Sequence, residues 1–401
     1  MGLGLTKSRI FLLSFVALVT LLAAACGSST GEADSTEPDS EAASGADEVS
    51  SGDAALTIEP SPTRSVLLPE IYEISNWINS EPTTIEAELD AGNVVLIDFW
   101  TYTCVNCLRT MPHLKGWYEK YADRGLTIIG VHSPEFEFEK INENVQDAVD
   151  RIGIRWPVAQ DNDMKTWRDF GNRFWPAKYL FSVEDELVYT HFGEGDYAET
   201  ETVIREQLIA AGHDIGDIPF EPLADDVRDA SATSLTRELY GGYERSYSQQ
   251  GVYNGHEAYY FGPDQVLEYE DSGELTDGRY FLSGLWENRA ESIVHAREDP
   301  YLEDYLRVPF GARSVNIVIE PAGPESLEVV VELDGAPLLP EQAGSDIVFK
   351  DDGTSVLQVT DSRLYAVLES PEFLEDELYF RSTSPNFAMF AFTFGINLEG
   401  S

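Results

Sequence analysis

The sequence contains little cysteine and little positive charge, and both shortages narrow the possible functions. Its 401 residues include three cysteines, and no two histidines have the spacing of a zinc-binding pair, so the chain offers no complete set of zinc ligands. The 26 lysines and arginines are outnumbered by 72 aspartates and glutamates, which gives a formal net charge of −46. A surface of that sign excludes nucleic acid and anionic lipid as electrostatic partners.

Long apolar runs are also missing, except near the start of the chain. Residues 10–25 are uncharged and mostly apolar, and Lys7 and Arg9 precede them. This run is short for a membrane span and typical of a signal peptide. It ends in Leu-Ala-Ala-Ala-Cys at Cys26, which resembles a bacterial lipobox with alanine at the usual leucine position. We expect residues 1–26 to be a lipoprotein signal peptide, and a lipid on Cys26 to anchor the chain to the membrane outside the cytoplasm. A soluble secreted protein is the alternative.

Basic residues are absent from residues 27–63, which contain nine carboxylates among serine, alanine, glycine and threonine. Such a segment cannot bury enough apolar surface to fold, so we expect a disordered acidic linker. The chain as a whole is 43% hydrophobic. Its remaining length is therefore globular and suffices for two or more domains.

The candidate chemistry lies at Cys104 and Cys107, between a predicted strand and a predicted helix. The β-branched run 94–97 is typical of a buried strand. Apolar residues after the pair recur every three or four positions, as on one face of a helix; they are Leu108, Met111, Leu114, Tyr118 and Tyr121. Free backbone N–H groups and the helix dipole stabilise a thiolate at a helix start. We expect the pKa of Cys104 to lie below the free-cysteine value of about 8.5.

Three other interpretations of the pair are weaker. A disulfide that closes so short a loop would stabilise the fold by only about 2 kcal/mol. A zinc site would need ligands that the chain does not offer at a suitable spacing. A thiol peroxidase needs an isolated peroxidatic thiolate with its own activating groups. The position between strand and helix favours a redox-active pair.

Residues 64–216 show the pattern of one α/β unit around this pair. A strand that follows the helix would complete a right-handed parallel strand–helix–strand unit. Two later strands flank a Glu184-Asp185 turn as a hairpin, and an amphipathic helix closes the unit. We expect these further elements at 126–131 (strand), 134–153 (helix), 177–181 and 186–190 (hairpin) and 198–211 (helix).

Four motifs in this unit resemble a known family. They are IDFWTYTC at 97–104, HSPEF at 132–136, WPAKYL at 175–180 and GEGDY at 193–197. Together with the proline inside the helix, Pro112, they resemble the thioredoxin fold in its TlpA-like branch, and most closely the redoxin domain of the DipZ family. The resemblance implies an α/β thioredoxin fold. It also implies a thiol–disulfide oxidoreductase that needs no cofactor or metal.

The resemblance implies roles for three residues. Cys104 would be the nucleophile that attacks a substrate disulfide, and Cys107 the resolving cysteine, so that a Cys104–Cys107 redox disulfide forms. Asp98, six residues before Cys104, would accept the proton of Cys107, and burial would raise the pKa of this carboxyl to suit that role. An N-cap or a solvated strand end is the alternative for Asp98.

Three further residues would contact the substrate. Pro176 would be cis and face the cysteines, with Trp175 beside it, and the backbone nearby would pair with the incoming chain. Trp100 would pack beside the cysteine pair, with plain core packing as the alternative. Glu194, between two glycines, lies either near the dithiol or in solvent.

The rest of the chain has the two-residue period of β-structure. Residues 217–236 lack periodicity and suggest an interdomain linker. We expect residues 237–401 to form an all-β sandwich of the jelly-roll kind, similar to the carbohydrate-binding-module-like domain that follows the redoxin domain in DipZ proteins. Its expected strands are 314–319, 327–333, 355–359, 364–368, 378–381 and 387–394. Its early aromatic residues would form sandwich core or stack on glycans; they are Tyr240, Tyr243, Tyr247, Tyr253, Tyr259, Tyr260, Phe261 and Trp286.

Taken together, these features predict a lipid-anchored, extracytoplasmic thiol–disulfide oxidoreductase that reduces protein disulfides. DipZ proteins carry a membrane-embedded electron-transfer domain that is not found in this sequence. We therefore expect a membrane electron donor of the CcdA type to act in trans. The alternative is a surface lipoprotein whose β-sandwich binds a glycan or a protein partner, with redox chemistry secondary.

Overall fold

The computed structural model describes residues 68–224, 234–249, 251–323 and 326–397. The predicted signal peptide with Cys26, the predicted linker 27–63 and part of the predicted linker 217–236 lie outside the described residues. Within the described residues, no helix combines the length and apolarity needed to cross a bilayer.

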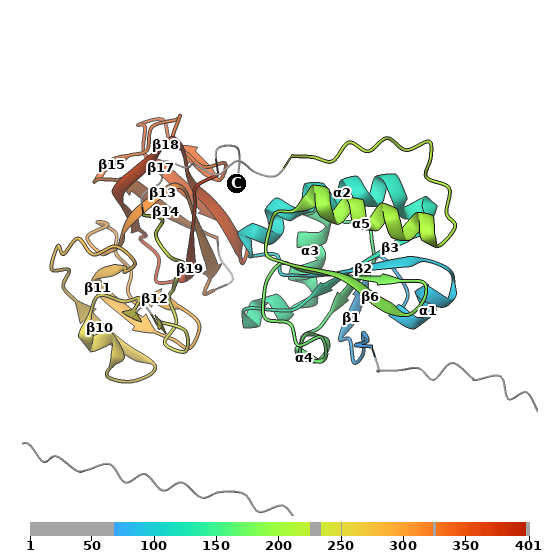
Figure 1. The fold of residues 1–401 in the computed structure, drawn as a ribbon. Helices are drawn as coiled ribbons and strands as arrows, with labels where there is room; N and C mark the ends of the chain where they lie inside the picture. The colour runs from blue at the N-terminus through green and yellow to red at the C-terminus, as the bar shows by residue number, and fades with distance from the viewer. Residues whose placement is uncertain (1–67, 225–233, 250, 324–325, 398–401) are drawn as a thin grey trace, which may run out of the picture. The chain divides into compact units, whose positions relative to one another are not determined.

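The first region is built on a six-stranded mixed sheet in the order β1-β4-β3-β2-β5-β6 (Figure 1). Its central strand β2, Val94–Trp100, is buried along its whole length. It pairs in parallel with β3, Leu126–His132, and antiparallel with β5, Ala177–Ser182. The other strands are β1 (Asn76–Ile78), β4 (Val158–Gln160) and β6 (Glu186–Phe192). The predicted strand–helix–strand unit and the hairpin are confirmed.

Helices cover both faces of this sheet because β2 is apolar on both sides. Val94, Leu96 and Trp100 pack into the same core as α2 (Val105–Tyr121), α3 (Asn142–Ile152) and α5 (Tyr197–Ala210). The alternate residues of β2 pack against α1 (Ile85–Asp90) and α4 (Lys165–Asp169). Since successive side chains of a strand point to opposite faces, Asp98 lies on the α2 side.

The helix predicted at 134–153 is wrong in its first half. A short 3₁₀ helix, η2 (Glu137–Lys140), stands there, and α3 begins only at Asn142. Ile141 separates them in an extended conformation, with φ −74° and ψ 120°. It is 47% exposed rather than on the buried face that its spacing predicted. Another short 3₁₀ helix, η1 (Ala122–Arg124), follows α2 and ends at Gly125, whose φ of 91° favours glycine.

The second region consists of antiparallel strands whose buried residues are mostly apolar. Eleven strands join in one sheet, within which the long strands β13 (Tyr305–Pro321) and β18 (Arg363–Arg381) pair with each other. The prediction of two separate strands at 364–368 and 378–381 is wrong, because β18 runs through both. Its pairing with β13 shifts register between Ala312 and Ser314, where irregular pairing lets long strands bend. The strand-rich fold class is confirmed.

The remaining elements of this region are short, and their bounds are as follows. They are β7 (Leu239–Tyr240), β8 (Tyr247–Ser248), β9 (Gly251–Val252), η3 (Glu257–Tyr260), β10 (Gln265–Tyr269), β11 (Phe281–Asn288), β12 (Ile293–His295), β14 (Leu327–Leu333), β15 (Ala336–Pro337), β16 (Ile347–Phe349), β17 (Ser355–Val359) and β19 (Phe387–Gly395). The turn between β14 and β15 is formed by Asp334 and Gly335, both with positive φ, as the sequence predicted.

Candidate functional site

Cys104 and Cys107 are free thiols at the start of α2. Cys104 is the N-cap residue of the helix, and its sulfur accepts a hydrogen bond from the backbone N–H of Cys107 at 3.3 Å. An N-cap acceptor satisfies one of the otherwise unpaired N–H groups of the first turn. Cys104 is partly exposed, whereas Cys107 is fully buried. The two sulfurs therefore differ in access: an incoming disulfide can reach the first and not the second.

The second thiol is held protonated by its surroundings. Burial raises the pKa of Cys107 well above its ordinary value, and the neighbouring sulfur of Cys104 and the charge of Asp98 raise it further. A thiol in this state is a poor nucleophile. Cys107 can attack only after a nearby base has removed its proton.

Asp98 is the buried base closest to that requirement. Only 1% of the residue is exposed, and burial raises the pKa of its carboxyl to about 7, although the charge of Lys178 opposes the shift. Oδ1 of Asp98 has no hydrogen-bond partner among the described residues. A carboxyl with a pKa near neutrality can both take up and release a proton at physiological pH.

Lys178 is a member of the site that the sequence analysis missed. It lies on β5 directly opposite Asp98 on β2, and it is fully buried. Burial lowers the pKa of its ammonium group, while the charges of Asp98, Cys107 and Glu194 raise it. Nζ has no hydrogen-bond partner among the described residues. A lysine inside the otherwise uncharged strand 177–182 was the available signal, but its partner depends on strand register, which the sequence does not give.

Trp100, which we predicted to pack beside the cysteine pair and contact the substrate, lies in the core of the first region. Its side chain is fully buried, because Trp100 lies two residues after Asp98 and therefore on the same, α2-facing side of β2. Its ring packs edge-on against His132 at a centroid distance of 5.1 Å. His132 is itself buried, which lowers the pKa of its imidazole to about 3. Trp100 therefore belongs to the core beneath the cysteine pair, the alternative stated above.

Trp175 and Pro176 form the loop that enters β5. The peptide bond between them is cis, as the resemblance implied. Trp175 is partly buried, and its indole N–H donates to the carbonyl of Ser133 at 3.0 Å. The carbonyl of Pro176 accepts from the N–H of Gly193 at 2.8 Å. These bonds fix the loop from both sides, and Phe174, 52% exposed, stands next to it.

Glu194 lies near the dithiol rather than in solvent. It accepts a hydrogen bond from Nε of Arg109 at 2.8 Å, and both side chains are mostly buried. Arg109 also donates from Nη2 to Oδ1 of Asn106 at 2.5 Å. Asn106 stands between the two cysteines in the sequence. The ion pair therefore ties the 193–195 loop to the first turn of α2.

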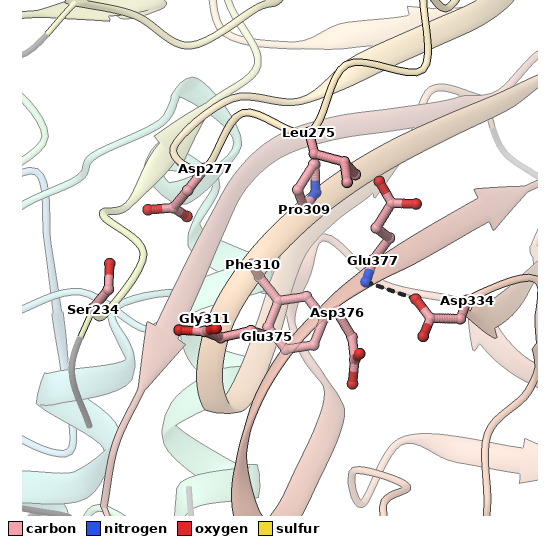
Figure 2. A pocket seen from close by; sticks show the side chains of 10 residues that line it. All are labelled: Ser234, Leu275, Asp277, Pro309, Phe310, Gly311, Asp334, Glu375, Asp376 and Glu377. Carbon is pink, nitrogen blue, oxygen red and sulfur yellow. Dashed lines mark hydrogen bonds between the residues drawn. The ribbon is translucent and has the colours of Figure 1, made fainter. Parts of the chain in front are cut away.

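The second region contains no cysteine. Of the eight early aromatic residues, Tyr240, Tyr253, Tyr259 and Trp286 are buried, Tyr243 is partly buried, and Tyr247, Tyr260 and Phe261 are exposed. A cavity of about 480 Å³ lies among its strands (Figure 2). Five carboxylates line it, from Asp277, Asp334, Glu375, Asp376 and Glu377. Phe310 is its only aromatic lining residue, so the cavity does not offer a pair of rings for stacking on a sugar.

Two family models match separate parts of the chain. A family model described as "AhpC/TSA family" matches residues 76–190, and one described as "Thioredoxin like C-terminal domain" matches residues 236–395. The first match contains β1 to β6 with the cysteine pair. The second covers the strand-rich region.

Known proteins with similar sequences include thiol–disulfide oxidoreductases. "Protein DipZ" of Mycobacterium bovis and of Mycobacterium tuberculosis is 35% identical over 67% of this chain, and the chain spans 36% of the length of each. "Thiol-disulfide oxidoreductase ResA" of Halalkalibacterium halodurans is 33% identical over 28% of this chain and 61% of that protein. A solved structure, a putative thioredoxin from Neisseria meningitidis, is 26% identical and covers 30% of this chain and 77% of its own, with a TM-score of 0.28. The predicted resemblance to DipZ is thereby confirmed.

Proposed function

We propose that this protein is a thiol–disulfide oxidoreductase that reduces disulfides of other proteins through Cys104 and Cys107. The observation that carries the proposal is the asymmetry of the pair: Cys104 is partly exposed at a helix start, while Cys107 is buried next to Asp98. Its similarity to "Thiol-disulfide oxidoreductase ResA" supports the same reaction class.

The first step joins the protein to its substrate. The Cys104 thiolate attacks one sulfur of a substrate disulfide, a Cys104–substrate bond forms, and the other substrate sulfur leaves as a thiolate. The hydrogen bond from the N–H of Cys107 holds the sulfur of Cys104 at the helix start before attack. The cis-Pro176 loop would hold the substrate backbone beside it.

The second step releases the substrate. Asp98 accepts the proton of Cys107, the resulting thiolate attacks the sulfur of Cys104, and the substrate leaves with its second sulfur reduced. Two electrons have then passed to the substrate, and the protein holds a Cys104–Cys107 disulfide. Lys178 lies opposite Asp98 and stabilises the carboxylate before it takes the proton.

The cellular setting of this reaction is a proposal from the sequence. The lipobox-like segment before Cys26 supports a lipid anchor and an extracytoplasmic location. Regeneration of the dithiol then needs a reductant at the membrane, and a donor of the CcdA type acting in trans would supply it. Secretion in the presence of labelled fatty acid, compared between the natural chain and Cys26→Ser, tests the anchor.

A second candidate function concerns the strand-rich region. The exposed rings of Tyr247, Tyr260 and Phe261 favour binding of a glycan or a protein partner there, with redox chemistry secondary. Calorimetry against common polysaccharides tests the glycan. If none of the polysaccharides gives a heat of binding, the proposed glycan binding is wrong.

The decisive experiment is a trapping assay with Cys107→Ser. Without the resolving thiol the first step stops at the mixed disulfide, so the variant should accumulate covalent complexes that reductant dissolves. The control Cys104→Ser should trap nothing and should lose insulin reduction. Equal trapping by both variants, or peroxide turnover in place of insulin reduction, would refute the proposal. The measured reduction potential of the pair decides the direction of electron flow.

A further inference from the structure

A buried carboxylate that the proposed reaction does not use is hydrogen-bonded to Thr103, the residue before Cys104. Glu139 of η2 is fully buried, although glutamate is almost never buried without partners. Its Oε1 accepts a hydrogen bond from the hydroxyl of Thr103 at 2.5 Å. Its Oε2 accepts the backbone N–H groups of Glu135 at 2.5 Å and of Phe136 at 3.0 Å. The carboxylate thus joins two separate segments of the chain.

The first of these segments leads directly into the reacting sulfur. Thr103 precedes Cys104 and is 1% exposed. The turn closes with a hydrogen bond from the N–H of Cys104 to the carbonyl of Thr101 at 3.3 Å. The sulfur of Cys104 can face the N–H of Cys107 only while this turn keeps its conformation.

The groups around Glu139 donate hydrogen bonds to its carboxylate, whose burial costs free energy. Burial raises the pKa of its carboxyl to about 7, the charge of Glu135 raises it further, and hydrogen bonds from Thr101 and Thr103 lower it. Glu135 in turn forms an ion pair with Arg245 at 2.6 Å, inside the same compact unit of the chain. No cation contacts Glu139 itself among the described residues, so its partners are all neutral donors.

We propose that Glu139 is a positioning residue for the reaction of Cys104: it holds the Thr103 hydroxyl and thereby keeps the sulfur of Cys104 against the N–H of Cys107. This inference rests on the proposed function, since it assigns a task only if Cys104 is the nucleophile. Glu139 touches neither sulfur, and its effect passes through Thr103.

The test compares a variant that lacks the hydroxyl of residue 103 with a variant that keeps it. Thr103→Val keeps the shape of the side chain but cannot donate to Glu139, whereas Thr103→Ser keeps the donor. In a Cys107→Ser background of the full chain, which retains the backbone N–H at 107, we expect iodoacetamide to alkylate Cys104 about three- to tenfold more slowly at pH 7 in Thr103→Val. Thr103→Ser should stay within about twofold.

The matched control is a second threonine–glutamate bond remote from the dithiol. Thr127 on β3 donates to Oε2 of Glu88 at 2.9 Å, and Thr127→Val should leave the alkylation rate unchanged. Thr103→Ala replaces Thr103→Val if the valine variant does not fold, as judged by circular dichroism. Glu139→Gln can keep the bridge, with its amide NH₂ toward the Thr103 oxygen, and should retain most of the rate.

The outcomes separate the two proposals. If the protein with its natural sequence fails to reduce insulin, the proposed function is wrong. If it reduces insulin while Thr103→Val and Thr103→Ser alkylate equally fast, the positioning role of Glu139 is wrong. A large loss in Glu139→Gln together with an unaffected Thr103→Val would assign the effect to charge and would also overturn the inference.

Discussion

Asp98 should make the folded protein less stable as the pH rises, and Asp98→Asn should remove that dependence. The pKa of this carboxyl rises from its ordinary 3.8 to about 7 because it is buried. Between those two pH values the unfolded chain has released the proton while the folded protein keeps it. The free energy of unfolding therefore falls by about 1.4 kcal/mol per pH unit, and by about 4 kcal/mol in total.

The sign of this effect can be checked at both ends. Below pH 3.8 the carboxyl is protonated in both states, so Asp98 contributes no penalty. Above about pH 7 it is ionised in both, and the full penalty applies. Asparagine does not ionise, so the advantage of Asp98→Asn should be small at pH 4.5 and approach about 4 kcal/mol at pH 8. That figure is a ceiling, because the variant leaves the Lys178 charge without its carboxylate.

Urea denaturation of the reduced protein at pH 4.5, 6 and 8 measures the difference between the two chains. Titrating groups that do not interact with Asp98 are common to both and cancel. A difference that stays constant across this range would refute the assignment of the raised pKa to Asp98. The same variant should resolve the mixed disulfide about a hundredfold more slowly at pH 7. This factor is at the low end of the rate loss expected when a general base is removed. Stopped-flow tryptophan fluorescence can follow the resolving step.

Two further substitutions probe the surroundings of the dithiol. Lys178→Met removes the charge that lowers the pKa of Asp98, so the pH at which insulin reduction reaches half its maximum should move upward; a profile that moves downward or not at all would contradict the pairing. Glu194→Gln leaves the mostly buried guanidinium of Arg109 without its counter-charge and should cost about 3 kcal/mol in urea denaturation, while the exposed control Glu199→Gln should cost less than about 0.5 kcal/mol.

The sequence predicted the parts of the site that depend on local pattern. The β-branched run before Cys104 and the helical spacing after it place the pair at the junction of β2 and α2, because both signals have short periods. The β5–β6 hairpin followed from two apolar runs around Glu184-Asp185. These elements need no knowledge of what packs against them.

The contacts and the helix boundary that the sequence did not predict depend on residues that are distant in the sequence. Lys178 reaches Asp98 only through the register of β5 against β2, and Glu139 reaches Thr103 across 36 positions of sequence. Neither contact can be inferred from the local sequence pattern. The break at Ile141 has the same origin: the carboxylate of Glu139 captures two N–H groups of the segment that the apolar spacing had assigned to one helix.

A buried ion pair of the strand-rich region contrasts with the buried pair of the candidate site. In the strand-rich region, Arg307 is buried, yet Nε and Nη2 donate to the two oxygens of Asp271 at 2.6 and 2.8 Å. Such a bidentate pair is satisfied and fixed. Asp98 and Lys178 are equally buried, yet each keeps a polar atom that has no hydrogen-bond partner among the described residues. An unsatisfied buried carboxyl lowers stability and leaves an oxygen free to take a proton. Since both sit under Cys107, we interpret this cost as the physical requirement of the resolving step.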